Sequence, residues 1–258
     1  MLKTNLLEEM SRVDIAEALK ETQTVLIPVG AIEQHGPHLP LLTDVLPVEV
    51  VSIRAAEKLG ALVAPTIKTG YSPFHMHVSP PNGTITLRPD TFINLMKDYA
   101  HCLARHGFKR IIFINGHGGN NNIIATTVVE LIHELPNSQT IWMSWFAVPE
   151  EYRQPTLHGH AGAIETALIL ALRPELVRLD RAVKELPHTP EGMTDDMLPT
   201  YFASDFALYR KSGVMGDPKK YTREQLIEIG EKCLEAGVKK VVRTIEVFKD
   251  AHVFKEEK

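Results

Sequence analysis

The chain has 258 residues, 44% of them apolar and 23% charged, which is typical of a globular protein, and we expect one domain over residues 1–258. The net charge of −4 without a basic stripe argues against nucleic acid, and no apolar run approaches the roughly 20 residues that span a membrane. The polar start of the chain and only two cysteines, Cys102 and Cys233, argue against export, disulfides and thiolate zinc sites, so we expect a cytoplasmic protein.

Short β-rich runs alternate with helical stretches along the chain. In chain order, the runs that predict strands are residues 24–29, 61–67, 84–87, 110–114 and 140–145. The stretches that predict helices are residues 46–59, 89–106, residue 120 to about 135, 162–172 and 222–248. Thr43 or Asp44 is the expected N-cap of the first of these helices, and Gly230 and Gly237 are candidate breaks in the last.

Strands that alternate with crossover helices predict an α/β fold with a mainly parallel sheet covered on both faces. In such sheets the functional site lies beyond the carboxyl ends of the strands. The least periodic region, residues 192–218, is rich in turn residues and is a candidate lid or subunit contact.

Residues of metal-ligand type follow the predicted strands. Glu33 and His35 come shortly after the first strand, and their i, i+2 spacing puts both side chains on one face of an extended chain. Asp44 precedes a helix, His117 sits in a glycine-rich turn after residues 110–114, and Glu165 lies near the start of another helix. Carboxylates and imidazoles without thiolates suit Zn²⁺, Mn²⁺ or Fe²⁺, and five such ligands exceed what one catalytic zinc uses. We therefore expect two divalent ions, with a carboxylate such as Asp44 bridging them.

Each of these residues also has an ordinary explanation when it is taken alone. Glu33 and His35 could belong to a solvated loop, and Asp44 could simply cap a helix. The glycine-rich turn around His117 could cradle a phosphate, although the lysine and hydroxyl residue of a P-loop are missing. Glu165 taken alone could be a surface residue, but it has apolar neighbours in sequence, where a buried carboxylate needs a partner. The metal interpretation rests on the whole set.

Four segments resemble the creatininase (creatinine amidohydrolase) family: Pro28–Pro40, Asn115–Asn120, His160–Thr166 and Ser212–Pro218. The resemblance runs from about residue 24 to 236 and implies a three-layer α/β/α fold, a dinuclear metal site, hydrolysis of non-peptide C–N bonds and, in many members, a hexamer.

Residue by residue, the resemblance assigns the expected ligands. Glu33 and His117 would bind one ion, His35 and Glu165 the other, and Asp44 would bridge them. His160 matches a histidine that assists proton transfer. The ions would lower the pKa of a bridging water and polarise the amide carbonyl, and His160 would protonate the leaving nitrogen.

Two departures argue against creatinine itself as the substrate. Creatininase has a glutamate where this chain has Gly119, and a tryptophan in the stretch that is residues 155–159 here. We therefore expect a small cyclic or N-formyl amide. His75 and His77 lie in the loop of residues 71–83 and either line the pocket or face solvent.

Three other functions remain open from the sequence. The chain could be a metal-bound assembly or binding protein without turnover, although His160 argues against this. It could be a creatinine amidohydrolase proper. It could also be a divalent-metal sugar isomerase, since such sites use similar ligand sets, but the first of the four segments argues against this.

Overall fold

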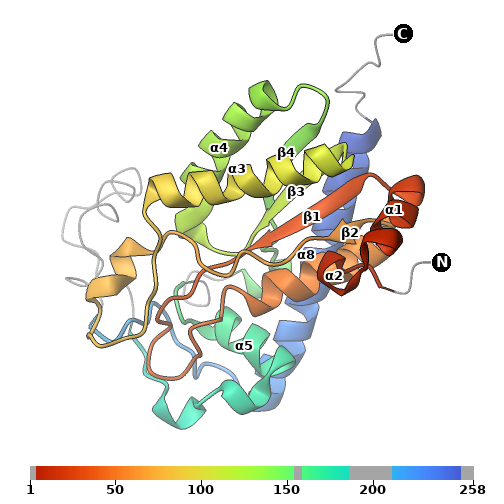
Figure 1. Cartoon of the computed structure of the whole chain (residues 1–258). Coiled ribbons are helices and arrows are strands. Elements are labelled where there is room, and N and C mark those ends of the chain that lie inside the picture. Colours follow the sequence, from red (N-terminus) through yellow and green to blue (C-terminus); the bar gives the residue numbers. More distant parts are fainter. Residues whose placement is uncertain (1–3, 154–158, 186–210, 251–258) are drawn as a thin grey trace.

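The computed structural model describes residues 4–153, 159–185 and 211–250. Its centre is a parallel sheet in the order β2-β1-β3-β4 (Figure 1). The strands are β1 (Thr24–Val29), β2 (Leu62–Val63), β3 (Arg110–Asn115) and β4 (Gln139–Ser144). Leu26 of β1 stands opposite Val63 on one side and Ile112 on the other.

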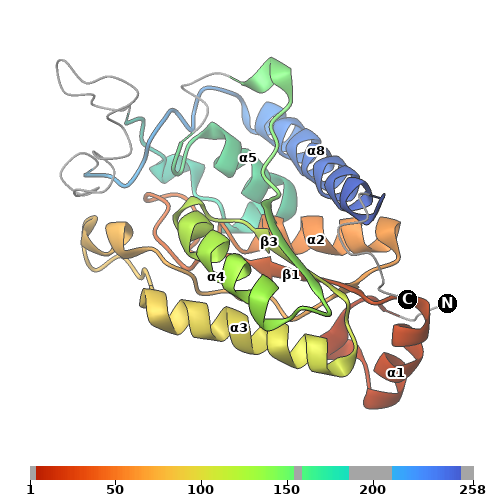
Figure 2. The same cartoon turned by 90° about the horizontal axis from the view of Figure 1, so that it is seen from above.

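Helices cover both faces of this sheet, so the predicted three-layer α/β/α architecture is confirmed (Figure 2). The longer helices are α1 (Arg12–Glu21), α2 (Leu46–Leu59), α3 (Pro89–His106), α4 (Asn121–Glu134), α5 (Ala163–Leu172) and α8 (Arg223–Asp250). Short 3₁₀ turns, η1 to η6, occupy Leu7–Glu9, Pro73–His77, Gly118–Asn120, Glu150–Tyr152, Pro174–Leu176 and Leu179–Arg181. Within the described residues, no helix is both long and apolar enough to cross a membrane.

The period-2 alternation of strand side chains divides the core into two layers. Leu26 and Ile112 pack with α2, α5 and α8 on one face. Val25, Ile27 and Phe113 pack with α1, α3 and α4 on the other. The central strands β1 and β3 are buried on both faces, which explains why they read as continuous apolar runs in the sequence.

Some sequence predictions of local structure are wrong. Residues 84–87 form no strand, since only Ile85 pairs with Ile32 in an isolated antiparallel bridge. The strand predicted over residues 61–67 is reduced to β2, and α1 was not among the predicted elements. The N-cap of α2 is Val45, without a side-chain cap, because Asp44 points into the cluster described below. Of residues 192–218, only residues 211–218 lie within the described part of the chain.

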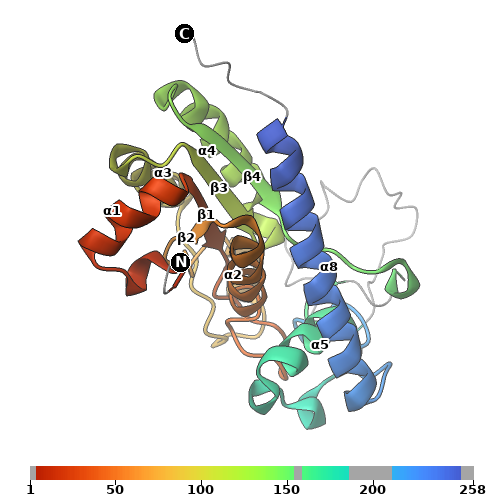
Figure 3. The same cartoon turned by 90° about the vertical axis from the view of Figure 1, so that its right-hand side faces the viewer.

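Helix α8 runs without a break through both glycines that were predicted to interrupt it (Figure 3). A Cβ at Gly230 would lie 2.1 Å from the carbonyl oxygen of Ala167 in α5, and one at Gly237 would lie 2.5 Å from the ring of Trp145. These glycines therefore allow α8 to approach its neighbours closely, and tertiary packing compensates for their low helix propensity.

We predict that Gly230→Val weakens the packing of α8 on α5, because the new side chain must push the two backbones apart. The expected loss of unfolding free energy is about 1–3 kcal/mol. The exposed neighbour Glu231 provides the control, and Glu231→Ala should change stability by less than about 0.5 kcal/mol. Thermal melting of both variants measures the difference, and an unchanged Tm for Gly230→Val would contradict the close approach.

Candidate metal centre

Four of the five predicted ligands lie on loops that leave the carboxyl ends of the strands, and the fifth lies at the start of a helix. Glu33 and His35 follow β1, Asp44 precedes α2, His117 follows β3, and Glu165 lies in the first turn of α5. They span more than 130 residues of sequence, but parallel strands bring their loops to one edge of the sheet.

Two glycines let the backbones of these loops meet. A Cβ at Gly30 would lie 2.9 Å from the Cα of Val45, and one at Gly116 would lie 2.5 Å from the carbonyl oxygen of Asp44. Neither position tolerates a side chain without movement of the Asp44 loop. The segment that carries Asp44 therefore packs directly against the backbone at the carboxyl ends of β1 and β3.

Asp44 lies at the middle of the cluster and faces one imidazole with each of its oxygens. Its Oδ2 is 2.9 Å from His117 Nδ1, and its Oδ1 is 3.5 Å from His35 Nε2. Glu33 Oε2 lies 3.3 Å from His117 Nε2, and Glu165 Oε2 lies 3.5 Å from His35 Nε2. The five side chains thus form two carboxylate–imidazole pairs on either side of a shared carboxylate.

Two ligand-type atoms in the cluster, Glu33 Oε2 and His35 Nε2, are buried without a hydrogen-bond partner. His35 Nδ1 lies 3.2 Å from the carbonyl oxygen of Glu33, which can only accept, so Nδ1 carries the hydrogen. Nε2 of the neutral ring then directs its lone pair at carboxylates. Negative charge and lone pairs gathered out of water require positive charge between them, and divalent cations fit this donor set.

The pKa shifts show the same need for positive charge. Burial raises the pKa of Glu33 and of Glu165 to about 7, against the opposing pull of nearby imidazoles. Burial also disfavours charged imidazole, but the carboxylates outweigh it and raise the pKa of His35 to about 10 and of His117 to about 9. Burial opposes the ionisation of Asp44 as well, yet His35 and His117 hold its pKa well below the usual range. Protons must neutralise the negative charge of the buried carboxylates wherever metal ions do not.

His160 lies beside this cluster. Its Nδ1 is 3.5 Å from Glu33 Oε1, its Nε2 is 2.6 Å from the carbonyl oxygen of Gln34, and its ring centroid is 4.1 Å from that of His35. Burial, reinforced by the charge of His35, lowers the pKa of His160 well below the usual value, so the ring is neutral.

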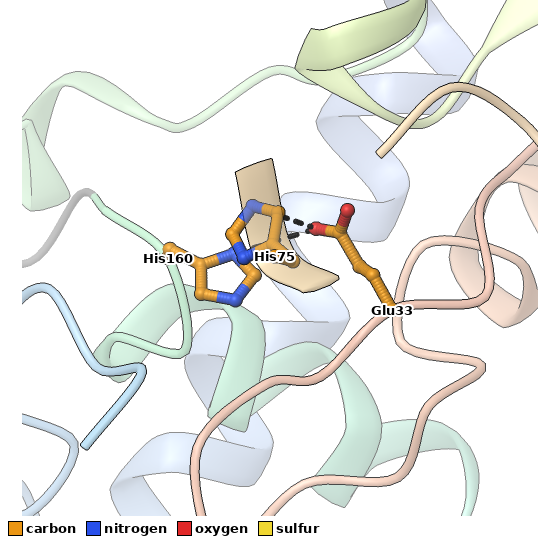
Figure 4. Close-up of side chains that lie close together, drawn as sticks. All are labelled: Glu33, His75 and His160. Carbon is orange, nitrogen blue, oxygen red and sulfur yellow. Dashed lines mark ion pairs between the residues drawn. The ribbon is translucent and has the colours of Figure 1, made fainter. Parts of the chain in front are cut away.

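His75 belongs to the same cluster, whereas His77 is exposed. The His75 ring stacks on His160 with centroids 4.2 Å apart, and its Nε2 lies 3.6 Å from Glu33 Oε1 (Figure 4). Burial lowers its pKa to about 3. Gln34, which was not singled out from the sequence, contacts both rings through its side-chain nitrogen. Its position between two predicted ligands was the only signal that could have marked it.

A cavity of about 400 Å³ opens onto the cluster. Besides the charged groups, its lining includes Gly118, Gly119, Asn121 and Phe146. A Cβ at Gly118 would meet nothing within 4 Å, whereas one at Gly119 would lie 2.4 Å from His117 Nε2. The cavity has the size of a small-molecule site, and the absence of a side chain at residue 119 leaves His117 open to it.

Known proteins resemble this chain over most of its length. The creatinine amidohydrolase of Pseudomonas putida is 32% identical over 238 residues, which cover 85% of this chain and 88% of that protein. The mycofactocin precursor peptide peptidase of Mycolicibacterium smegmatis is 31% identical over 204 residues, covering 77% and 76%. A solved mutant creatininase of Zn-Zn type matches with a TM-score of 0.78 and 30% identity, over 95% of this chain and 98% of that one.

The family model described as creatinine amidohydrolase matches residues 8–245. This range contains every strand of the sheet and every residue of the cluster described above. The chain therefore belongs to the creatininase family.

Proposed function

We propose that this creatininase-family hydrolase is a dinuclear metalloenzyme that cleaves a non-peptide C–N bond in a small cyclic or N-formyl amide. The observation that carries the proposal is the position of Asp44, which offers one oxygen to each of two imidazoles among buried atoms without partners. A shared carboxylate between two sets of ligands is typical of hydrolytic two-metal sites.

In this proposal Glu33 and His117 hold one cation, His35 and Glu165 hold the other, and Asp44 bridges them. Two divalent ions held there would supply a water of lowered pKa and would polarise the amide carbonyl. The protein must then bring the substrate to the open cavity and move one proton from the water to the leaving nitrogen. His160 is assigned that proton, because its Nδ1 faces the cluster at 3.5 Å from Glu33.

The nature of the substrate is inferred from the cavity and from the departures in sequence. A volume of about 400 Å³ suits a small molecule. Gly119 replaces the glutamate expected of creatininase proper, and residues 155–158, where its tryptophan would fall, lie outside the described residues. The ligand set suits zinc, manganese and iron alike, and the likeness to a Zn-Zn creatininase favours zinc as the first metal to test.

The proposal also includes a cytoplasmic homo-oligomer, with a hexamer as the expected assembly. The family resemblance supports the assembly, and two unpaired cysteines, Cys102 and Cys233, suit a reducing compartment. Light scattering of the purified protein tests the assembly.

The reaction class is tested with purified protein loaded with Zn²⁺, Mn²⁺ or Fe²⁺ and a panel of lactams, formamides and creatinine. We expect two ions per chain and hydrolysis of at least one cyclic or N-formyl amide. Two bound ions without hydrolysis of any amide would favour a binding protein instead, and hydrolysis of creatinine alone would identify a creatinine amidohydrolase.

We predict that Asp44→Asn removes metal and activity together, because the amide cannot balance two cations as the carboxylate does. The fall in kcat/KM should exceed about 100-fold, since mutation of residues that only hydrogen-bond to metal ligands already lowers metal affinity or activity by about 10- to 100-fold. Asp98→Asn makes the same change on the exposed face of α3 and should leave both properties as in the wild type. Elemental analysis and kinetics measure both, and wild-type metal content in Asp44→Asn would refute the bridging assignment.

We also predict that metal binding releases protons and strengthens as the pH rises. In the metal-free protein, His35 and His117 have pKa values of about 10 and 9, so both hold protons at pH 7.5 that a cation must displace. Calorimetric titration with Zn²⁺ in buffers of different ionisation enthalpy should show release of more than one proton per chain. Affinity should fall further below pH 7, where Glu33 and Glu165 are also protonated. A proton count of zero at pH 7.5 would contradict the shifts.

A further inference from the structure

Gln34 lies between two of the proposed ligands and holds its side-chain amide in one orientation. The backbone N–H of Gly36 donates to Gln34 Oε1 at 2.9 Å, which identifies that atom as the oxygen. Gly213 leaves space for the amide, since a Cβ there would lie 2.0 Å from Oε1. The side-chain nitrogen, Nε2, must therefore face the other way, toward the histidines.

The amide nitrogen determines where His75 carries its hydrogen. Gln34 Nε2 lies 2.9 Å from His75 Nδ1, and an amide nitrogen can only donate, so Nδ1 is the acceptor. The hydrogen of the neutral ring is then on Nε2. That atom is 3.6 Å from Glu33 Oε1, on the side of the cluster.

The backbone of Gln34 determines the opposite arrangement in His160. His160 Nε2 lies 2.6 Å from the carbonyl oxygen of Gln34, and two lone pairs at that distance would repel, so Nε2 carries the hydrogen. The contact of 3.1 Å between His160 Nε2 and Gln34 Nε2 then joins two donors and is not a hydrogen bond. Nδ1 keeps its lone pair and lies 3.5 Å from Glu33 Oε1.

We propose that Gln34 is a positioning residue that fixes complementary tautomers in two stacked imidazoles, so that His160 presents an acceptor and His75 a donor to the reaction centre. The proposal rests on the proposed function only in assigning proton transfer to His160. In that reaction His160 Nδ1 accepts the proton that the attacking water loses and passes it to the leaving nitrogen as the C–N bond breaks. His75 keeps its proton and donates a hydrogen bond.

The tautomer of His75 decides whether a further group of side chains can bind a metal. Glu33, His75 and His160 place ligand atoms within 4.8 Å of one another (Figure 4). A protonated His75 Nε2 has no lone pair in the ring plane, so it cannot bind a cation there. His75 is thus a hydrogen-bond donor beside the two proposed ions and does not create a third metal position.

Neutron diffraction from a deuterium-exchanged crystal of the Zn²⁺-loaded wild-type protein tests the tautomers directly. We expect deuterium on His75 Nε2 and on His160 Nε2, with none on either Nδ1. Deuterium on His75 Nδ1, or zinc bound by His75, would overturn the proposal. If these positions are found but no amide is hydrolysed, the proposed function fails and the tautomer assignment stands.

The variant Gln34→Met removes the donor without adding charge and with a similar side-chain volume. In its neutron structure we expect deuterium on His75 to be no longer confined to Nε2. His160 should keep deuterium on Nε2, because the backbone carbonyl of residue 34 remains. Zinc content should stay at the wild-type level, and kcat should fall by about 10- to 100-fold with a smaller change in KM.

Gln225→Met makes the same replacement at an exposed position near the start of α8 and is the matched control. It should leave kcat, zinc content and both tautomers unchanged. Wild-type kcat together with an unmoved His75 hydrogen in Gln34→Met would show that the amide does not set the tautomer, and would overturn the proposal.

Discussion

The burial of three carboxylates around two imidazoles is the constraint on which the rest of this structure depends. Asp44 contacts His35 and His117 at once, and Glu33 and Glu165 complete the two sides. Such a cluster is costly unless positive charge is held within it. The scaffold must therefore hold these side chains in place against their mutual repulsion, which requires rigid elements on every side.

The parallel sheet supplies that rigidity. All four strands point the same way, so the loops after β1 and β3 emerge together at one edge, where Gly30 and Gly116 let the Asp44 segment lie against them. The long helix α8 braces α5, the helix that carries Glu165, through the close contact at Gly230. Residues that never touch the cluster thus determine how closely its members meet.

Around the carboxylates, backbone carbonyls orient the imidazoles. The carbonyl of Glu33 accepts a hydrogen bond from His35 Nδ1, and the carbonyl of Gln34 accepts one from His160 Nε2, so the other nitrogen of each ring faces the centre of the cluster. The three residues from Glu33 to His35 therefore supply two of the proposed ligands, two orienting carbonyls and the amide proposed to position His75.

The sequence by itself determined the layer architecture, most element boundaries and the candidate ligands of the cluster, because periodicity, glycine caps and residue type are local properties. It also indicated the family through its motifs. Only the tertiary structure decided that α8 continues through Gly230 and that Val45 is the N-cap of α2 instead of Asp44. It also decided that His75 joins the cluster while His77 faces solvent. Each of these depends on contacts between segments distant in the chain, such as His75 with His160, and no local pattern encodes such contacts.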